Sequence, residues 1–137
     1  MKITLCSSAS FFYRLPSIKN ALENIGYEVL LPSMTNFHHL PERAFAKIQH
    51  NLIKEHFRKI DQSNAVYIAN YEKKGIEGYI GGNVFLEMGK AFDREIPIFL
   101  MKDIPKSSAY KDELTALQPI VIGRNWNKLE ELLRKGC

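Results

Sequence analysis

A single carboxylate, Glu87, stands among apolar residues directly after a cluster of glycines in the stretch GYIGGNVFLEMGKAF, residues 78–92. Helical periodicity places Glu87 at the border of the apolar face that contains Val84 and Met88. A carboxylate at such a border can line a cleft, and burial against apolar groups there can tune its pKa. The alternative is an exposed Glu87 that pairs with Lys90 on the helix surface.

Gly81 and Gly82 come immediately before this predicted helix. Glycine allows positive backbone torsions and a close approach of the backbone to a ligand. The free N–H groups at a helix start, together with the positive end of the helix dipole, suit an anion. Asn83 is expected to be the N-cap residue. The pattern is neither the dinucleotide motif G-x-G-x-x-G nor a P-loop, so a turn that only reverses the chain remains an alternative.

Strands and helices that alternate along the whole chain must position these residues. The apolar runs typical of buried strands cover residues 3–6, 27–31, 65–69, 96–101 and 119–122. The helical patterns cover residues 16–25, 42–61, 83–92, 108–117 and 127–135. This alternation predicts an α/β fold in a single domain, residues 1–137. We expect a doubly wound, flavodoxin- or Rossmann-like sheet of five parallel strands in the order 2-1-3-4-5, with helices on both faces.

In this strand order, ligands bind outside the carboxyl ends of strands 1 and 3, where the winding of the sheet reverses. One loop at this point is SSASFFYR, which follows the first strand. The other is the connection that begins at Asn70 and contains the glycines. Connections from strand to helix usually take about 2–6 residues, and one as long as this is usually either functional or disordered.

Composition and charge describe an ordinary globular chain. Of the 137 residues, 45% are hydrophobic and 25% are charged, and the net charge is +4. Lys and Arg are scattered, so no footprint for specific nucleic-acid binding is expected. No apolar run is long enough to span a bilayer, and no secretory signal opens the chain. We therefore expect a cytoplasmic protein without a membrane partner.

Neither the cysteines nor the histidines show the spacing of a metal site. Cys6 ends the first apolar run and is expected to be a buried, small apolar residue. The adjacent His38 and His39 would point apart on a regular element. His50 and His56 are expected to be partly exposed on the long helix. We therefore expect no metal ion and no organic cofactor.

The segments NAVYIAN, GGNVFLEMGKA and REIPIFLM resemble the nucleoside 2-deoxyribosyltransferase-like family. The block from Glu87 to Ala91 matches the family's Glu-hydrophobic-Gly-x-Ala helix start in order and spacing, and KITLCSSAS is similar to its first strand and substrate loop. The resemblance implies that a small-molecule nucleoside or nucleotide is the partner. It also implies a homo-oligomer, in which a neighbouring subunit completes the pocket.

The mechanism that the resemblance implies begins with attack by Glu87 on the anomeric carbon of the sugar, which expels the nucleobase. Water then resolves the glycosyl-enzyme by hydrolysis, or a second base resolves it by transfer. Gly81 stands where the transferases carry an aspartate, and this favours hydrolysis. Tyr13 would orient the carboxylate. The expected substrate-binding residues are Ser7, Ser8, Ser10, Asn70, Gly81, Gly82 and Asn83.

Two other functions remain open at this point. A phosphoribohydrolase-like enzyme would carry the motif Pro-Gly-Gly-x-Gly-Thr-x-x-Glu, of which this chain has Gly81, Gly82 and Glu87 but neither the proline nor the Gly-Thr pair. A non-catalytic regulatory module that binds a nucleotide or nucleoside would use the same loop and would not need Glu87.

Overall fold

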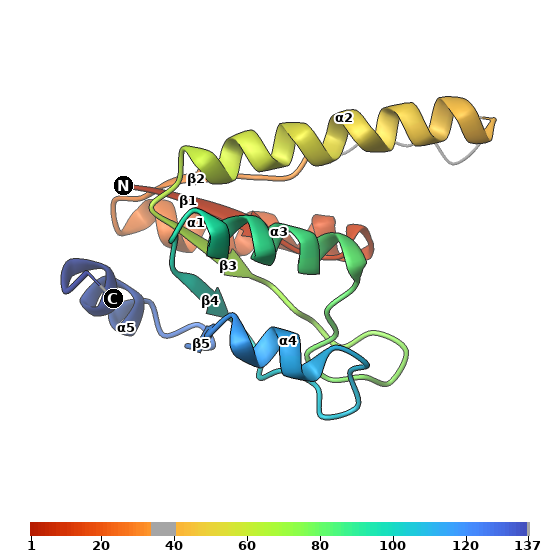
Figure 1. The fold of residues 1–137 in the computed structure, drawn as a ribbon. Helices are drawn as coiled ribbons and strands as arrows, with labels where there is room; N and C mark the ends of the chain where they lie inside the picture. The colour runs from red at the N-terminus through yellow and green to blue at the C-terminus, as the bar shows by residue number, and fades with distance from the viewer. Residues whose placement is uncertain (34–40, 137) are drawn as a thin grey trace.

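A five-stranded parallel sheet forms the centre of the protein (Figure 1). The structure is a computed structural model, which describes residues 1–33 and 41–136. The strand order is β2-β1-β3-β4-β5. The strands are β1 (Lys2–Cys6), β2 (Glu28–Leu30), β3 (Ala65–Ile68), β4 (Ile98–Leu100) and β5 (Ile120–Val121). The predicted fold class and strand order are therefore confirmed.

Helices follow the strands as the sequence pattern predicts. They are α1 (Leu15–Asn24), α2 (Glu42–Asp61), α3 (Gly82–Asp93), α4 (Lys111–Ala116) and α5 (Trp126–Arg134). The loop after β1 also contains a short 3-10 helix, η1 (Ala9–Arg14), which the sequence analysis did not predict. Among the described residues, none of the helices combines the length and the apolarity needed to cross a membrane.

The helices cover both faces of the sheet, because alternate residues of each buried strand point to opposite sides. On β1, Ile3 and Leu5 belong to the core that α1 and α5 cover. Cys6 belongs to the second core, which includes residues of α2, α3 and α4. The last residue of β1 therefore presents its side chain to the face on which α2 and α3 pack.

The long connection between β3 and α3 is held against the end of β4 by one amide side chain. Asn70 Nδ2 donates hydrogen bonds to the carbonyl oxygens of Gly78, at 3.2 Å, and Lys102, at 2.8 Å. Its Oδ1 accepts from the Lys102 N–H at 2.9 Å. Gly78 has a φ of +71°, and a Cβ atom there would overlap the carbonyl oxygen of Asp103. Glycine is thus required at this position both for its torsion and for the close approach.

Candidate active site

The helix that carries Glu87 begins one residue earlier than the sequence predicts. Gly81 is the N-cap, with φ −88° and ψ −178°, and no side chain caps the helix. The carbonyl of Gly81 accepts from the Phe85 N–H at 3.0 Å, the first hydrogen bond of α3. Asn83 therefore lies inside the first turn, and its predicted role as the N-cap is wrong. Extended backbone at Gly81 lets the chain enter the helix at Gly82.

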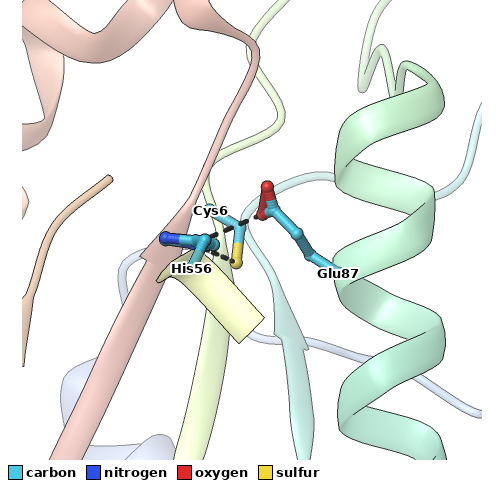
Figure 2. Close-up of side chains that lie close together, drawn as sticks. All are labelled: Cys6, His56 and Glu87. Atoms are coloured by element: carbon cyan, nitrogen blue, oxygen red, sulfur yellow. Dashed lines mark hydrogen bonds and ion pairs between the residues drawn. The ribbon is translucent and has the colours of Figure 1, made fainter. Parts of the chain in front are cut away.

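Glu87 points from α3 toward the sheet and contacts side chains from two other elements. Its Oε2 atom lies 3.4 Å from Nε2 of His56, which comes from α2. The same Nε2 atom lies 3.5 Å from Sγ of Cys6, at the end of β1. Figure 2 shows the three side chains converging from these elements. The Glu87 side chain is only 14% exposed and that of His56 only 6%, so the contact is nearly closed to solvent.

Burial disfavours the charged form of each of these groups. It raises the pKa of Glu87 to about 8. A hydrogen bond from Cys6 lowers this pKa, but its effect is smaller than that of burial. It lowers the pKa of His56 to about 4, with a further decrease from the nearby Lys59 cation. It also raises the pKa of the Cys6 thiol, and the neighbouring Glu87 adds to that increase. The cluster thus favours a neutral carboxyl, imidazole and thiol near pH 7.

The surface alternative for Glu87 is wrong. Lys90, its predicted partner, places Nζ 3.2 Å from Oδ1 of Asp61 at the end of α2. Arg94 Nε lies at the same distance from that oxygen. These ion pairs join α3 to α2 and leave Glu87 facing inward.

The serines after β1 lie at the carboxyl edge of the sheet. Ser7 is buried, and its hydroxyl donates to the carbonyl of Ser8 at 3.0 Å. The Ser8 hydroxyl accepts from Lys73 Nζ at 3.0 Å. Asn70 uses both N–H donors of its amide on backbone carbonyls. Only Oδ1 of Asn70 is therefore left to contact a substrate. The substrate-binding roles of Ser7 and Ser8 remain predictions.

Tyr13 is not brought to the carboxylate that it was expected to orient. Its side chain is 73% exposed, and among the described residues it makes no hydrogen bond to Glu87. The contacts of Glu87 come from Cys6 and His56, because η1 turns Tyr13 outward. Ser10 is exposed as well. The backbone N–H groups near Gly81 and Gly82 remain candidates for a substrate hydroxyl or phosphate.

His56 is the functional candidate that the sequence reasoning missed. It was expected to be partly exposed, yet it is 5% exposed. The signal was present: His56 lies four residues after Leu52 and four before Ile60, on the apolar stripe of α2. Its Nδ1 atom lacks a well-formed hydrogen bond, although the Leu5 backbone lies close enough to raise its pKa. The paired His38 and His39 lie outside the described residues.

Three cationic side chains lie at the carboxyl edge of the sheet, and the sequence alone did not indicate that they would come together. The Arg14 guanidinium lies 3.8 Å from the centre of the Tyr71 ring. Arg124 Nη2 donates to the Tyr71 hydroxyl at 3.1 Å. Lys73 lies 5.2 Å from the centre of the Tyr79 ring. Because these residues follow different strands, only the parallel sheet brings them to one edge.

Comparisons with solved structures find the same arrangement of strands and helices elsewhere. BcmB, a CMP N-glycosidase of Clostridium botulinum, aligns with 96% of this chain and 97% of its own, at a TM-score of 0.53 and 14% identity. The fold of this chain is similar to that of an N-glycosidase. A conserved protein of Enterococcus faecalis V583 aligns with 100% of this chain and 99% of its own, at a TM-score of 0.52 and 13% identity.

A 2-deoxyribosyltransferase of Bacillus psychrosaccharolyticus also matches, with 19% identity, over 73% of this chain and 71% of that one. The TM-score of this match is 0.48. No protein-family model matches the chain, and no curated protein matches it. The fold predicted from the alternation of strands and helices is thus similar, at low identity, to that of a CMP N-glycosidase.

Proposed function

We propose that the protein cleaves the N-glycosidic bond of a nucleoside or nucleoside monophosphate with Glu87 as the nucleophile. The observation that carries the proposal is the buried carboxyl of Glu87, held 3.4 Å from His56 Nε2 on the helix after the glycine loop. The similarity in fold to a CMP N-glycosidase supports the choice of reaction. A surface glutamate would not need these buried contacts.

In the proposed reaction, Glu87 must first become a carboxylate. The positive charge that develops at C1′ favours the carboxylate form of Glu87. The neutral Nε2 of His56, 3.4 Å away, then accepts the carboxyl proton against the order of the resting pKa values, about 8 for Glu87 and about 4 for His56. A Glu87 oxygen then forms a bond to C1′ of the sugar, and the bond from C1′ to the base nitrogen breaks. The departing base keeps the electron pair and takes a proton from solvent. Water adds to C1′, the glutamyl ester bond breaks, and the proton of the water is released.

A phosphorylated substrate fits the charges at the carboxyl edge of the sheet. Arg14, Lys73 and Arg124 place cationic groups around Tyr71 and Ser8. Arg and Lys are the side chains that recognise phosphate. We therefore propose a nucleoside 5′-monophosphate in preference to a free nucleoside. The net charge of +4 would assist its approach.

A homo-oligomer remains part of the proposal. In Figure 1 the N-terminal half of α2 extends past α3. Ile48 and Leu52 on this part of the helix are only half-buried. A second copy packed on this face would cover them and bring residues of its own close to α2 and α3. Light scattering coupled to size-exclusion chromatography tests this, and a mass of one chain, 15.8 kDa, would contradict it.

The decisive experiment incubates the protein with a panel of nucleosides and nucleoside monophosphates and detects free base by chromatography. The proposal expects release of base from at least one monophosphate, and slower release from the matching nucleoside. A protein that binds nucleotides, releases no base and keeps its affinity when Glu87 is replaced would be a non-catalytic binding module. That outcome would reject the proposed enzyme.

A further inference from the structure

We propose that Cys6, His56 and Glu87 form a binding site for zinc or a similar thiophilic divalent cation. The ligand atoms of these three residues lie within 4.8 Å of one another. The site departs from the expectation of no metal that the sequence alone supported. It combines one sulfur, one nitrogen and one oxygen donor from β1, α2 and α3.

Two of the three distances between the donor atoms match the edges of tetrahedral coordination. Bonds to zinc of about 2.3 Å for sulfur and about 2.0–2.1 Å for nitrogen or oxygen give tetrahedral edges of about 3.5 Å between S and N and about 3.4 Å between N and O. The separation of Cys6 Sγ from His56 Nε2 is 3.5 Å. That of His56 Nε2 from Glu87 Oε2 is 3.4 Å. The third separation, between Cys6 Sγ and the Glu87 carboxyl, lies within 4.8 Å, so a bound cation would draw these two groups together around His56 Nε2.

The polar atoms at the centre of the cluster are poorly satisfied without a further partner. Glu87 Oε2 is buried, and it makes no regular hydrogen bond to the described residues; the only polar groups near the carboxyl among them are His56 Nε2, at 3.4 Å, and the weakly donating Cys6 thiol. Buried carboxylate oxygens ordinarily have such a partner, and one that lacks it calls for an explanation. A cation bonded to this oxygen, to the imidazole nitrogen and to the sulfur would supply the missing partner.

Charge and donor type indicate which cation fits. A thiolate from Cys6 and a carboxylate from Glu87 would balance the two positive charges of zinc, so the buried complex carries no net charge. Thiolate and imidazole ligands select zinc, copper or iron over magnesium or calcium. Three protein ligands leave a fourth position for water. The Leu5 backbone, which lies close enough to His56 to raise its pKa, would help to orient the imidazole ring.

Occupancy of this site has a consequence for catalysis that rests on the proposed function. A lone pair of Glu87 that binds zinc is withdrawn from attack on the sugar, and the cation reduces the nucleophilicity of the whole carboxylate. Zinc would therefore inhibit base release, at the concentration that fills the site. The binding of the cation itself does not depend on the protein being an enzyme.

Cobalt provides a probe of the site that needs no substrate. In a Cys137→Ser background, Cys6 is the only cysteine in the chain. We expect chelator-treated protein to bind one Co²⁺ per chain, with a near-ultraviolet charge-transfer band from the thiolate to the metal. Zinc should displace the cobalt and abolish the band. Absence of the band in this folded protein would overturn the proposal.

Matched variants test each ligand. Cys6→Ser should abolish the band, and His56→Gln or Glu87→Gln should weaken Co²⁺ binding by about 10-fold or more. His50→Gln on α2 and Glu113→Gln on α4 change exposed residues of the same types and should leave binding unaltered. Equal binding by His56→Gln, Glu87→Gln and their controls would refute the assignment of these ligands.

A second measurement keeps the proposal falsifiable where a variant does not fold. In the Cys137→Ser protein, zinc should slow alkylation of the Cys6 thiol at least 10-fold and raise the midpoint of thermal unfolding. Magnesium at the same concentration should do neither. No protection by zinc would reject the site. A cobalt band without base release would refute only the enzyme, and zinc-insensitive base release without a band would refute only the metal site.

Discussion

His56 Nε2 lies 3.4 Å from Glu87 Oε2, and both side chains are almost completely buried between α2, α3 and the end of β1. A histidine and a glutamate at this separation on the surface would form an ordinary ion pair. In this low-dielectric environment, burial opposes charge on both groups. The carboxyl proton of Glu87 therefore moves to His56 only when a bound substrate offsets the difference between their pKa values, about 8 and about 4.

Glu87→Gln should reduce base release by about 10³-fold or more, because an amide cannot form the glycosyl ester. Gln has nearly the same shape, so the affinity for the nucleotide should change little. Single-turnover release of base and equilibrium binding measure the two effects separately. The control is Glu113→Gln, an exposed glutamate on α4. Near-parental activity of the Glu87 variant would reject its role as nucleophile.

His56→Asn should lower kcat by about 10²-fold and leave KM nearly unchanged, as expected for the loss of a proton acceptor. The activity that remains should rise with pH toward about 8, the pKa of Glu87, because only the ionised carboxylate then reacts. His50→Asn on the exposed side of α2 provides the control. If kcat of the variant depends on pH as it does in the parent, His56 is not the proton acceptor and contributes only to packing.

The free energy of unfolding should fall as the pH rises from 6.5 to 8 in protein treated with a chelator. Burial raises the pKa of Glu87 from 4.5 to about 8, so in this range the folded state holds a proton that the unfolded state has lost. The loss should reach about 2 kcal/mol at most, at about 1.4 kcal/mol per pH unit. His56 has an ordinary pKa of 6.5 and a folded pKa of about 4, so its opposite effect lies mainly below this window.

Urea unfolding at the two pH values checks this dependence. Glu87→Gln should remove most of the change in unfolding free energy between the two pH values. The variant should therefore be more stable than the parent at pH 8. Glu113→Gln should keep the parental dependence, because Glu113 is exposed. An equal loss of stability in the parent and in Glu87→Gln would show that another group is responsible.

Gly78→Ala should destabilise the protein by about 3 kcal/mol or more, because a Cβ atom would overlap the Asp103 carbonyl at a backbone torsion that disfavours any side chain. Gly75→Ala measures the energetic cost of the positive φ without any steric overlap. Gly75 has a similar φ of +79° and no atom within 4 Å of the added Cβ, so its cost should be about 1 kcal/mol. Chemical denaturation measures both, and equal costs would contradict the predicted overlap.

Asn70→Ala should lower the free energy of unfolding by about 2–4 kcal/mol, because it leaves the Gly78 and Lys102 backbone groups without partners. Asn83→Ala is the control. Asn83 is exposed and does not cap α3, so its replacement should cost less than about 0.5 kcal/mol. A loss of about 1 kcal/mol at Asn83 would restore the predicted N-cap.

The sequence alone was sufficient to predict the fold. Strand runs such as residues 65–69 and helical stripes such as residues 42–61 match β3 and α2 closely. Their strict alternation leaves few ways to form a parallel sheet, because crossovers are right-handed. Periodicity also predicted that Glu87 lies at the edge of an apolar face. Local backbone geometry was less predictable, as the incorrect N-cap at Asn83 shows.

What the sequence determined by itself was the order of the strands and helices, the switch point of the sheet, and Glu87 as the residue of interest near it. Only the tertiary structure decided that Cys6 and His56 surround this carboxyl and that Tyr13 does not. The physical reason is that hydrophobic periodicity determines which face of each helix is buried. It does not specify which residue of another helix meets that face, because this depends on how α2 and α3 pack side by side on the sheet.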